Sequence, residues 1–338
     1  RQEGGSWWAS VAWPQAGPTV PGTGFQHGLE TAEYVCAARP GTRKSQTIAP
    51  PLCVKSAPML KSYDLHAHST ASDGTLSPAQ LMQRAHAAGV EVMALTDHDT
   101  LEGLPEARTA ARALGLGFVP GVEISVTWER VTVHIVGLGV DPDSEVLDRG
   151  LAGLREFRDW RAEEIGRRLA RHGIEGAFEG ALAYSNGRLI SRTHFAHFLV
   201  EKCHARDLRA VFRHFLVNGK PGFVSGQWAE LEDAVRWIRE SGGQAVIAHP
   251  ARYKVNRGKL RRLIGEFVEV GGEAIEVVSG SHSREDYFTI AAHAQDFGLL
   301  ASAGSDYHGP EHPWIELGRL PELPRGCKPV WQEWPVTN

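Results

Sequence analysis

Residues 63–68 read Tyr-Asp-Leu-His-Ala-His, and residues 92–99 read Val-Met-Ala-Leu-Thr-Asp-His-Asp. Each stretch is a short apolar run that ends in histidine and aspartate, which is the pattern of a buried strand followed by a polar loop. A helix is predicted between them, because Ser77 and Pro78 suit its N-cap and first turn and Gly89 suits its end. The sequence therefore predicts a strand, a helix and a second strand in succession.

The same alternation continues along the chain. Further strands are predicted at residues 118–119, 131–136, 245–248, 274–278 and 299–303, and further helices at residues 105–114, 231–240, 260–268 and 287–297. Repeated strand–helix alternation favours a parallel sheet, and about seven strands of this kind close into a β/α barrel. The predicted fold class is α/β.

The alternation stops between residues 141 and 223, where only helical patterns occur. Apolar residues recur there at helical spacing among many Arg and Glu residues, as in Leu154, Phe157, Trp160, Ile165 and Leu169. We interpret residues 141–223 as a helical insertion subdomain in a barrel made of residues 59–140 and 224–325.

Residues 1–58 differ in composition from the rest. They contain Trp7, Trp8 and Trp13 among many Pro, Gly, Ser and Thr residues, without a sustained helical or strand period. We expect a largely disordered N-terminal extension, and Met59 offers an alternative start just before the first strand. No apolar run approaches the length of a membrane span, and no secretory signal is evident, which indicates a cytoplasmic protein without membrane association.

Metal-binding side chains recur where the predicted strands end. His66, His68, Asp73, His98, Glu123, His249, Asp306 and His308 each lie at or after the end of a strand. The carboxyl ends of barrel strands meet at one face, so these residues become neighbours. A single histidine is more often a structural residue, but so many ionisable groups at one face would be costly unless paired or metal-bound. Mixed nitrogen and oxygen ligands suit manganese, iron or zinc.

His134 lies inside a predicted strand in which Val131, Val133 and Ile135 form the other face. On spacing alone it is equally consistent with a metal ligand and with a half-buried, hydrogen-bonded side chain.

Six blocks resemble the signature motifs of the polymerase-and-histidinol-phosphatase (PHP) family. They are His66-Ala67-His68-Ser69, Ser72-Asp73-Gly74, Thr96-Asp97-His98-Asp99, Gly121-Val122-Glu123-Ile124-Ser125, Ala248-His249-Pro250 and Gly304-Ser305-Asp306-Tyr307-His308. The resemblance implies a distorted seven-stranded β/α barrel with three divalent ions, preferably manganese, and hydrolysis of phosphoesters by a metal-bound water. It assigns one ion to His66, His68, Glu123 and Asp306, a second to Asp73, His98 and His308, and a third to Glu123, His134 and His249.

Within the family, residues 192–196 (Arg-Thr-His-Phe-Ala) and 219–224 (Gly-Lys-Pro-Gly-Phe-Val) are similar to the bacterial branch of nucleoside 3',5'-bisphosphate phosphatases and 5'-to-3' exoribonucleases. This likeness implies a nucleotide substrate or short RNA. Catalytic roles are expected for His194, as a general acid, and for Asp73 and Glu123. A second phosphate would need cationic donors, for which Arg161, Arg192, Thr193, His194 and Lys220 are the candidates. Arg161 is equally consistent with a solvated charge on a helix surface.

The basic residues Arg252, Lys254, Arg257, Lys259, Arg261 and Arg262 follow His249 without an intervening acid. They are interpreted as a guide for an RNA 5' end, with a solvated loop as the alternative. Two other functions remain open at this point: a small-metabolite phosphatase of the histidinol-phosphatase type, and a non-catalytic metal-binding regulatory module. No protein partner is implied.

Overall fold

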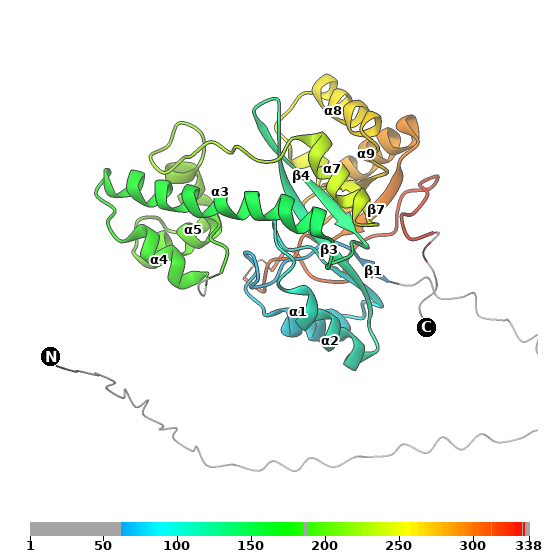
Figure 1. Cartoon of the computed structure of the whole chain (residues 1–338), viewed down its shortest axis with the longest axis horizontal. Coiled ribbons are helices and arrows are strands. Elements are labelled where there is room, and N and C mark those ends of the chain that lie inside the picture. Colours follow the sequence, from blue (N-terminus) through cyan, green and yellow to red (C-terminus); the bar gives the residue numbers. More distant parts are fainter. Residues whose placement is uncertain (1–61, 186–187, 312, 333, 335–338) are drawn as a thin grey trace, which may run out of the picture. The chain divides into compact units, whose positions relative to one another are not determined.

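The computed structural model describes residues 62–338 except 186–187, 312, 333 and 335–338 (Figure 1). The predictions for residues 1–58 and for Met59 lie outside the described residues. The division of the remaining chain into barrel and insertion stays a prediction, although residues 145–216 contain only helices among their regular elements.

A sheet of seven strands follows the order of the chain. Its strands are β1 (Tyr63–Asp64), β2 (Val92–Leu95), β3 (Gly117–Trp128), β4 (Val131–Leu138), β5 (Gln244–Ile247), β6 (Ala274–Ser279) and β7 (Leu300–Gly304). The two ends of the sheet meet, because the N–H of Leu65 donates to the carbonyl of Ala303 at 3.0 Å and that of His68 to the carbonyl of Tyr307 at 2.9 Å. The predicted distorted seven-stranded barrel is confirmed.

Strand β4 runs in the opposite direction to both of its neighbours. It pairs antiparallel with β3 and with β5, whereas the other neighbouring strands pair in parallel. The expectation of an all-parallel sheet is therefore wrong at β4. The reason is the connection between β3 and β4, which consists of Glu129 and Arg130 at φ angles of 43° and 68°. So short a link joins antiparallel strands only, because a parallel pair needs a crossover of about a dozen residues.

Strand β3 is longer than predicted and contains Glu123. The prediction placed Glu123 after a strand at residues 118–119, but Glu123 pairs with Val136 in the middle of the β3–β4 ladder. Side chains alternate between the faces of a strand, so Glu123 lies on the face opposite to Val122 and Ile124. Glu123 therefore reaches the barrel end from within a strand.

Five of the described helices and a short turn lie on the outside of the barrel, and the first of them begins at the predicted N-cap Ser77. They are α1 (Pro78–Ala87), α2 (Leu104–Leu114), α7 (Leu231–Glu240), α8 (Arg257–Glu269) and α9 (Arg284–Phe297), with a short 3-10 turn, η2 (Pro250–Arg252). Ser77 and Gln80 form a capping box at the start of α1, and Gly115 ends α2 in the left-handed conformation.

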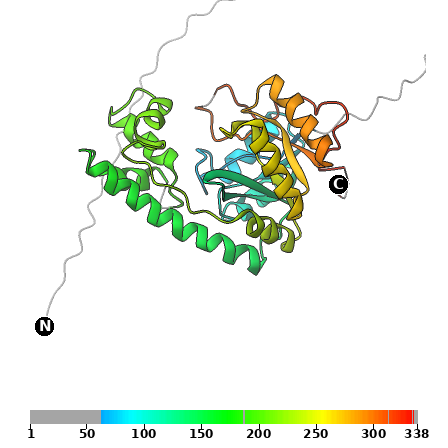
Figure 2. The ribbon, with the colours of Figure 1, turned by 90° about the horizontal axis from the view of Figure 1, so that it is seen from above.

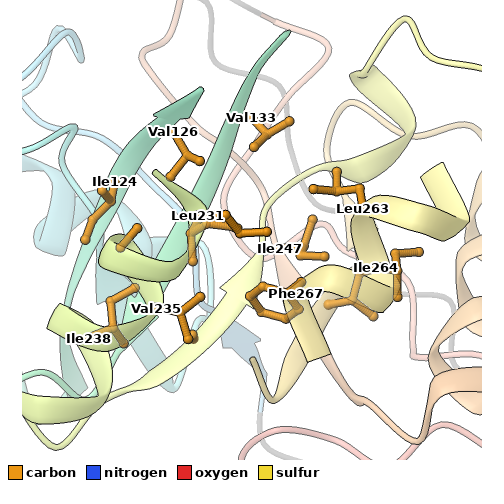
Figure 3. Packing of buried hydrophobic residues seen from close by; sticks show 14 of the residues in the cluster. Ile124, Val126, Val133, Leu231, Val235, Ile238, Ile247, Leu263, Ile264 and Phe267 are labelled. Carbon is orange, nitrogen blue, oxygen red and sulfur yellow. The ribbon is translucent and has the colours of Figure 1, made fainter. Parts of the chain in front are cut away.

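The largest hydrophobic cluster lies between the sheet and these helices. Figure 3 shows Leu231, Val235 and Ile238 of α7 beside Ile124 and Val126 of β3, and all of them are buried. On α8, Leu263, Ile264 and Phe267 are fully buried in the same cluster (Figure 3). Burial of each such side chain stabilises the folded protein by about 1.5–3 kcal/mol. This core holds in place the strands whose ends carry the polar residues.

Residues 145–216 form a second group of helices with its own core (Figures 1 and 2). They are α3 (Glu145–Ala170), α4 (Ala177–Tyr184), α5 (Arg192–Glu201), α6 (Leu208–Val211) and a π-helical turn, η1 (Phe212–Leu216). From α3, Ile165 and Leu169 are buried in this core, whereas Trp160 is 49% exposed although its spacing predicted the apolar face. None of the described helices, α3 included, is both long and apolar enough to cross a membrane.

Candidate metal centre and the adjoining cavity

All nine side chains predicted as metal ligands are brought together by the fold. They form four groups whose donor atoms lie within 4.8 Å of one another: His68, Asp73, His98 and His308; His66, Glu123 and His249; His66, His68 and Asp306; and His98, Glu123 and His134. Four of these residues belong to two groups each, so the groups make one continuous cluster. The assignment of particular residues to three separate ions stays a prediction.

Glu123 lies at the centre of this cluster. Its Oε1 is 2.8 Å from His134 Nδ1 and 2.9 Å from His249 Nε2, and its Oε2 is 2.9 Å from His98 Nδ1 and 3.3 Å from His68 Nε2. Each oxygen of this carboxylate therefore faces a different set of histidines. The reversed direction of β4 brings His134 to this position, because Ser125 and His134 are paired across the hairpin.

The other two carboxylates face the remaining histidines. Asp306 Oδ1 lies 3.3 Å from His68 Nε2 and 3.6 Å from His66 Nε2, and Asp73 Oδ1 lies 3.4 Å from His308 Nε2. Both carboxylates are buried. The cluster therefore alternates carboxylate oxygens with imidazole nitrogens.

Electrostatics keep the carboxylates ionised despite their burial. Burial alone would raise the pKa of Glu123, but His134, His98 and His66 hold that pKa well below its usual range. Burial lowers the pKa of the His68 imidazole to about 3, and the neighbouring His308 adds to this effect. In contrast, although burial opposes it, Asp73 raises the pKa of His308 to about 9, and Glu123 and Glu276 raise the pKa of His66 well above its usual value. Metal ions bind the neutral imidazole, so binding at these two histidines would displace protons.

Buried polar atoms without hydrogen-bond partners are a second observation that suits the binding of divalent ions at the cluster. Among the described residues, seven buried side-chain polar atoms have no hydrogen-bond partner, and five of them belong to the cluster: His68 Nδ1, Asp73 Oδ1, His98 Nδ1, Glu123 Oε2 and His249 Nδ1. Glu123 Oε2 and His98 Nδ1 lie 2.9 Å apart but are not aligned as a hydrogen bond. Each unsatisfied buried polar atom lowers the stability of the folded protein by about 1–3 kcal/mol. Several such atoms at one place therefore indicate a site that binds a partner such as a metal ion. Imidazole and carboxylate donors without thiolate suit manganese, iron or zinc.

Glu276 of β6 supports the cluster and was not predicted. Its Oε1 lies 3.2 Å from His66 Nδ1, and its Oε2 accepts the backbone N–H of His249 at 2.5 Å. A carboxylate on the far nitrogen of a ligand histidine fixes the orientation of the ring. The signal in the sequence was available, since Glu276 is the one residue of the predicted strand 274–278 that is not apolar.

A cavity of about 240 Å³ adjoins the cluster. Seven of the nine predicted ligands line it, namely Asp73, His98, Glu123, His134, His249, Asp306 and His308. The other walls come from the β3–β4 hairpin, from α3 and α5, and from residues 223–228. The helices of residues 145–216 therefore contribute directly to the space beside the cluster.

Five of the described arginines line this cavity: Arg130 of the β3–β4 turn, Arg252 of η2, and three from α3 and α5, namely Arg158, Arg161 and Arg192. Arg158 was not predicted, and its Nε donates to Asp99 Oδ2 at 2.7 Å while its Nη2 donates to Ser125 Oγ at 2.8 Å. In the sequence, Arg158 is surrounded by other charged residues of α3, which are typical of an exposed helix surface, and it was therefore not identified as a residue of the site. Arg158 is neutralised by Asp99, so it is the least available of the three for an external anion.

Arg161 and Arg192 have no carboxylate partner within 4.0 Å in the described part of the chain. The alternative of a solvated Arg161 is wrong, because this side chain is only 6% exposed and both Nε and Nη2 donate to the carbonyl of Val224 at 3.3 Å. Burial, together with Arg192 and Arg158, lowers the pKa of Arg161 to about 9, so it remains a cation at neutral pH. The carbonyl alone does not neutralise this buried charge.

Two further residues predicted to contact the substrate, Thr193 and Lys220, differ in whether they line the cavity. Thr193 lines the cavity, and its Oγ1 donates to Asp73 Oδ2 at 3.2 Å. Lys220 is exposed and is not part of the cavity lining, because it lies in a turn in which the N–H of Lys220 donates to Val217 and the N–H of Phe223 donates to Lys220. The structure does not bring Lys220 to the site.

His194 is also absent from the cavity lining. Its Nδ1 accepts the N–H of Ser191 at 3.1 Å and completes the capping box at the start of α5, where Ser191 is the N-cap. The ring is 5% exposed, and burial lowers its pKa. This placement disagrees with the expected role of general acid and supports a structural role at the start of α5, next to Arg192.

The basic run after His249 is interrupted by acids from distant parts of the chain. Arg252 lines the cavity and forms an ion pair with Asp306. Lys259 and Arg262 both pair with Glu129 of the β3–β4 turn, and Arg261 pairs with Asp296 of α9 at 2.6 Å. Acids that are not neighbours in the sequence therefore offset much of the charge of this run, and its role as a guide for an RNA 5' end stays a prediction.

Known proteins resemble this chain over most of its length. It is 51% identical over 271 residues to a 3',5'-nucleoside bisphosphate phosphatase from Chromobacterium violaceum, covering 80% of this chain and 95% of that protein. It is 44% identical over 274 residues to the 5'-3' exoribonuclease Rnm from Escherichia coli, covering 80% and 93%.

Solved structures agree with these relatives. A protein from Chromobacterium violaceum described as an amidohydrolase superposes with a TM-score of 0.78 at 50% identity, covering 80% of this chain and 95% of that one. A metal-dependent phosphoesterase from Bifidobacterium adolescentis superposes with a TM-score of 0.68 at 25% identity, covering 81% and 94%. The family model described as PHP domain matches residues 64–246, and the chain therefore belongs to the PHP domain family.

Proposed function

We propose that this protein is a metal-dependent phosphoesterase that removes the 3'-phosphate of nucleoside 3',5'-bisphosphates and shortens 5'-phosphorylated RNA in the 5'-to-3' direction. One observation carries the proposal: a single cavity is lined both by a carboxylate–histidine cluster and by Arg161 and Arg192, which have no carboxylate partner within 4.0 Å among the described residues. Such a cavity suits a substrate with two phosphates. The names of the relatives, a bisphosphate phosphatase and a 5'-3' exoribonuclease, support the same substrates.

The cluster would hold three divalent ions, preferably manganese, through His66, His68, Asp73, His98, Glu123, His134, His249, Asp306 and His308. When bound, such ions supply Lewis acidity, which activates water towards phosphorus and neutralises charge on the leaving oxygen. The protein positions these ligands through Glu276, and through Asp97, whose carboxylate accepts the N–H of Ser69 at 2.7 Å and the hydroxyl of Ser72 at 2.6 Å. Asp73 and Glu123 are the proposed catalytic carboxylates.

Arg161 and Arg192 would bind the phosphate that is not hydrolysed, since a guanidinium matches the geometry of a phosphate. Thr193 follows Arg192 at the start of α5 and contacts Asp73, so it links the two ends of the site. A 5'-phosphate held by the arginines would place the 3'-phosphate at the cluster. The same arrangement would cleave RNA one nucleotide from its 5' end.

The proposal is tested with the full chain supplied with Mn²⁺. Phosphate release from adenosine 3',5'-bisphosphate is compared with release from adenosine 3'-monophosphate and from histidinol phosphate. We expect the bisphosphate to be the best substrate, and a 5'-phosphorylated short RNA to be degraded faster than its 5'-hydroxyl counterpart. Preference for histidinol phosphate would replace the proposal with the small-metabolite alternative. No hydrolysis of any substrate with Mn²⁺ demonstrably bound would favour a non-catalytic module.

A further inference from the structure

The cavity contains three aromatic side chains that the chemistry of phosphates does not explain: Phe212, Phe223 and Trp228. Phe212 begins the π-helical turn η1, and Phe223 and Trp228 lie on the segment that returns from the insertion to the barrel. Neither metal ions nor phosphates require aromatic neighbours, so the three rings have a separate role.

Trp228 is already engaged by neighbouring protein groups. The guanidinium carbons of Arg158 and Arg161 lie 4.9 Å and 5.4 Å from its ring centroid, and the ring of Phe157 meets it edge-on at 4.9 Å. Its Nε1 donates to Thr132 Oγ1 at 3.3 Å. We interpret Trp228 as the support that holds the two arginines of α3 in place.

Phe212 packs against the hydrophobic core and also lines the cavity. It is half-buried and packs against the hydrophobic core of residues 162–224, and the guanidinium carbon of Arg192 lies 5.7 Å from its ring centroid. A π-helical turn inserts an extra residue into a helix and is frequent at functional sites. The turn η1 thus coincides with the residue that is presented to the cavity.

Phe223 has a fixed backbone and a ring that lies outside the hydrophobic clusters found in the described part of the chain. Its N–H donates to the carbonyl of Lys220 at 3.0 Å, and its own carbonyl accepts from the guanidinium of Arg168. The ring is half-buried and lines the cavity. An aromatic ring held in this way, without an apolar partner in its own core, suits a planar ligand.

We propose that Phe212 and Phe223 form a base-stacking wall that binds the nucleobase of the substrate. The inference rests on the proposed function, in which the two phosphates bind to the cluster and to Arg161 and Arg192. A nucleoside bisphosphate has one other large surface, the flat and largely apolar base, and these two rings are the aromatic surface of the cavity that remains for it. Stacking tolerates every base because each has a π-face, which suits an enzyme that must accept successive nucleotides of an RNA.

The test compares a nucleotide with the same molecule lacking its base. Binding of adenosine 3',5'-bisphosphate and of abasic ribose 3',5'-bisphosphate is measured by calorimetry, and phosphate release from both is measured with Mn²⁺. For the unchanged protein we expect binding to weaken on the order of tenfold when the base is removed. Phe212→Leu and Phe223→Leu should each weaken binding of the nucleotide severalfold and leave binding of the abasic compound nearly unchanged.

Phe215→Leu is the matched control, because Phe215 belongs to the same turn η1 and packs on the same core but does not line the cavity. Equal weakening of both compounds by Phe212→Leu and Phe223→Leu would assign the rings a structural role and overturn the inference. Base-independent binding by the unchanged protein would overturn it as well. Base-dependent binding without phosphate release would uphold the wall and reject the proposed hydrolysis, so the two failures are distinguishable.

Discussion

Arg158 of helix α3 and Asp99 of the loop after β2 form a buried ion pair in which Nε and Nη2 lie 2.7 Å and 2.5 Å from the same oxygen, Oδ2. The other oxygen of Asp99 accepts the N–H of Ser125 at 2.7 Å. Asp99 directly follows the candidate ligand His98. The pair therefore connects helix α3 to a loop that carries part of the candidate metal cluster.

Arg158→Met should destabilise the protein by about 3–5 kcal/mol, because it leaves the buried carboxylate of Asp99 without its partner. The free energy of unfolding is measured by urea denaturation. Adding Asp99→Asn to Arg158→Met should recover much of the loss, since no buried charge then remains unpaired. Strictly additive losses in the double variant would show that the two side chains are not coupled.

Arg161→Met and Arg192→Met should each raise the KM for adenosine 3',5'-bisphosphate about tenfold to hundredfold, because each removes a charged hydrogen bond to a phosphate. Adenosine 3'-monophosphate lacks the second phosphate, and its kinetics should change little. Lys220→Met is the control and should behave as the unchanged protein, since Lys220 is exposed and outside the cavity lining. Similar losses on both substrates would contradict a role in binding the second phosphate.

Glu276→Gln should weaken binding of Mn²⁺ about tenfold to hundredfold, because the carboxylate that orients His66 is lost. Metal affinity is measured by competition with a fluorescent chelator, which does not depend on turnover. Glu273→Gln provides a control in the same region, with a more exposed carboxylate 4.0 Å from Arg239. An unchanged affinity in Glu276→Gln would mean that the backbone alone positions the histidine.

Removal of metal with a chelator should abolish activity and lower the melting temperature, because ions bind the folded state only. At a concentration of Mn²⁺ one hundred times its Kd, binding stabilises a protein by about 2.7 kcal/mol. Glu123→Gln should lose most of this increase, since Glu123 faces five histidines of the cluster. A Mn²⁺-dependent rise in melting temperature that is the same in Glu123→Gln would place the ions elsewhere.

The predicted ligands converge because their positions follow from the ends of strands, and strand ends are recognisable from local apolar runs. His66, His98 and His249 are examples, each two or three residues beyond the last residue of a short strand. The direction of β4 was not recognised, because the stretch from Gly121 to Trp128 was not identified as part of a strand and the tight turn at residues 129–130 was therefore missed.

Apart from this convergence at the strand ends, pairings between particular side chains of distant segments could not be predicted. Arg158 and Asp99 are 59 residues apart, and His66 and Glu276 are 210 residues apart. Local sequence reveals that a residue is charged but not what it meets across the fold. For the same reason Arg161 resembled a surface charge, and Lys259 and Arg262 resembled members of a basic run without acidic partners.

The helices of residues 145–216 supply Arg158, Arg161, Arg192 and Phe212 to the cavity, whereas the cluster of histidines and carboxylates comes from the strands and loops of the barrel. On the proposed function, recognition of the substrate and its hydrolysis would thus be assigned largely to separate stretches of the chain. Exchange of residues 141–223 for the corresponding segment of a relative would be a way to redirect such an enzyme to a new phosphoester while its hydrolytic machinery is inherited unchanged.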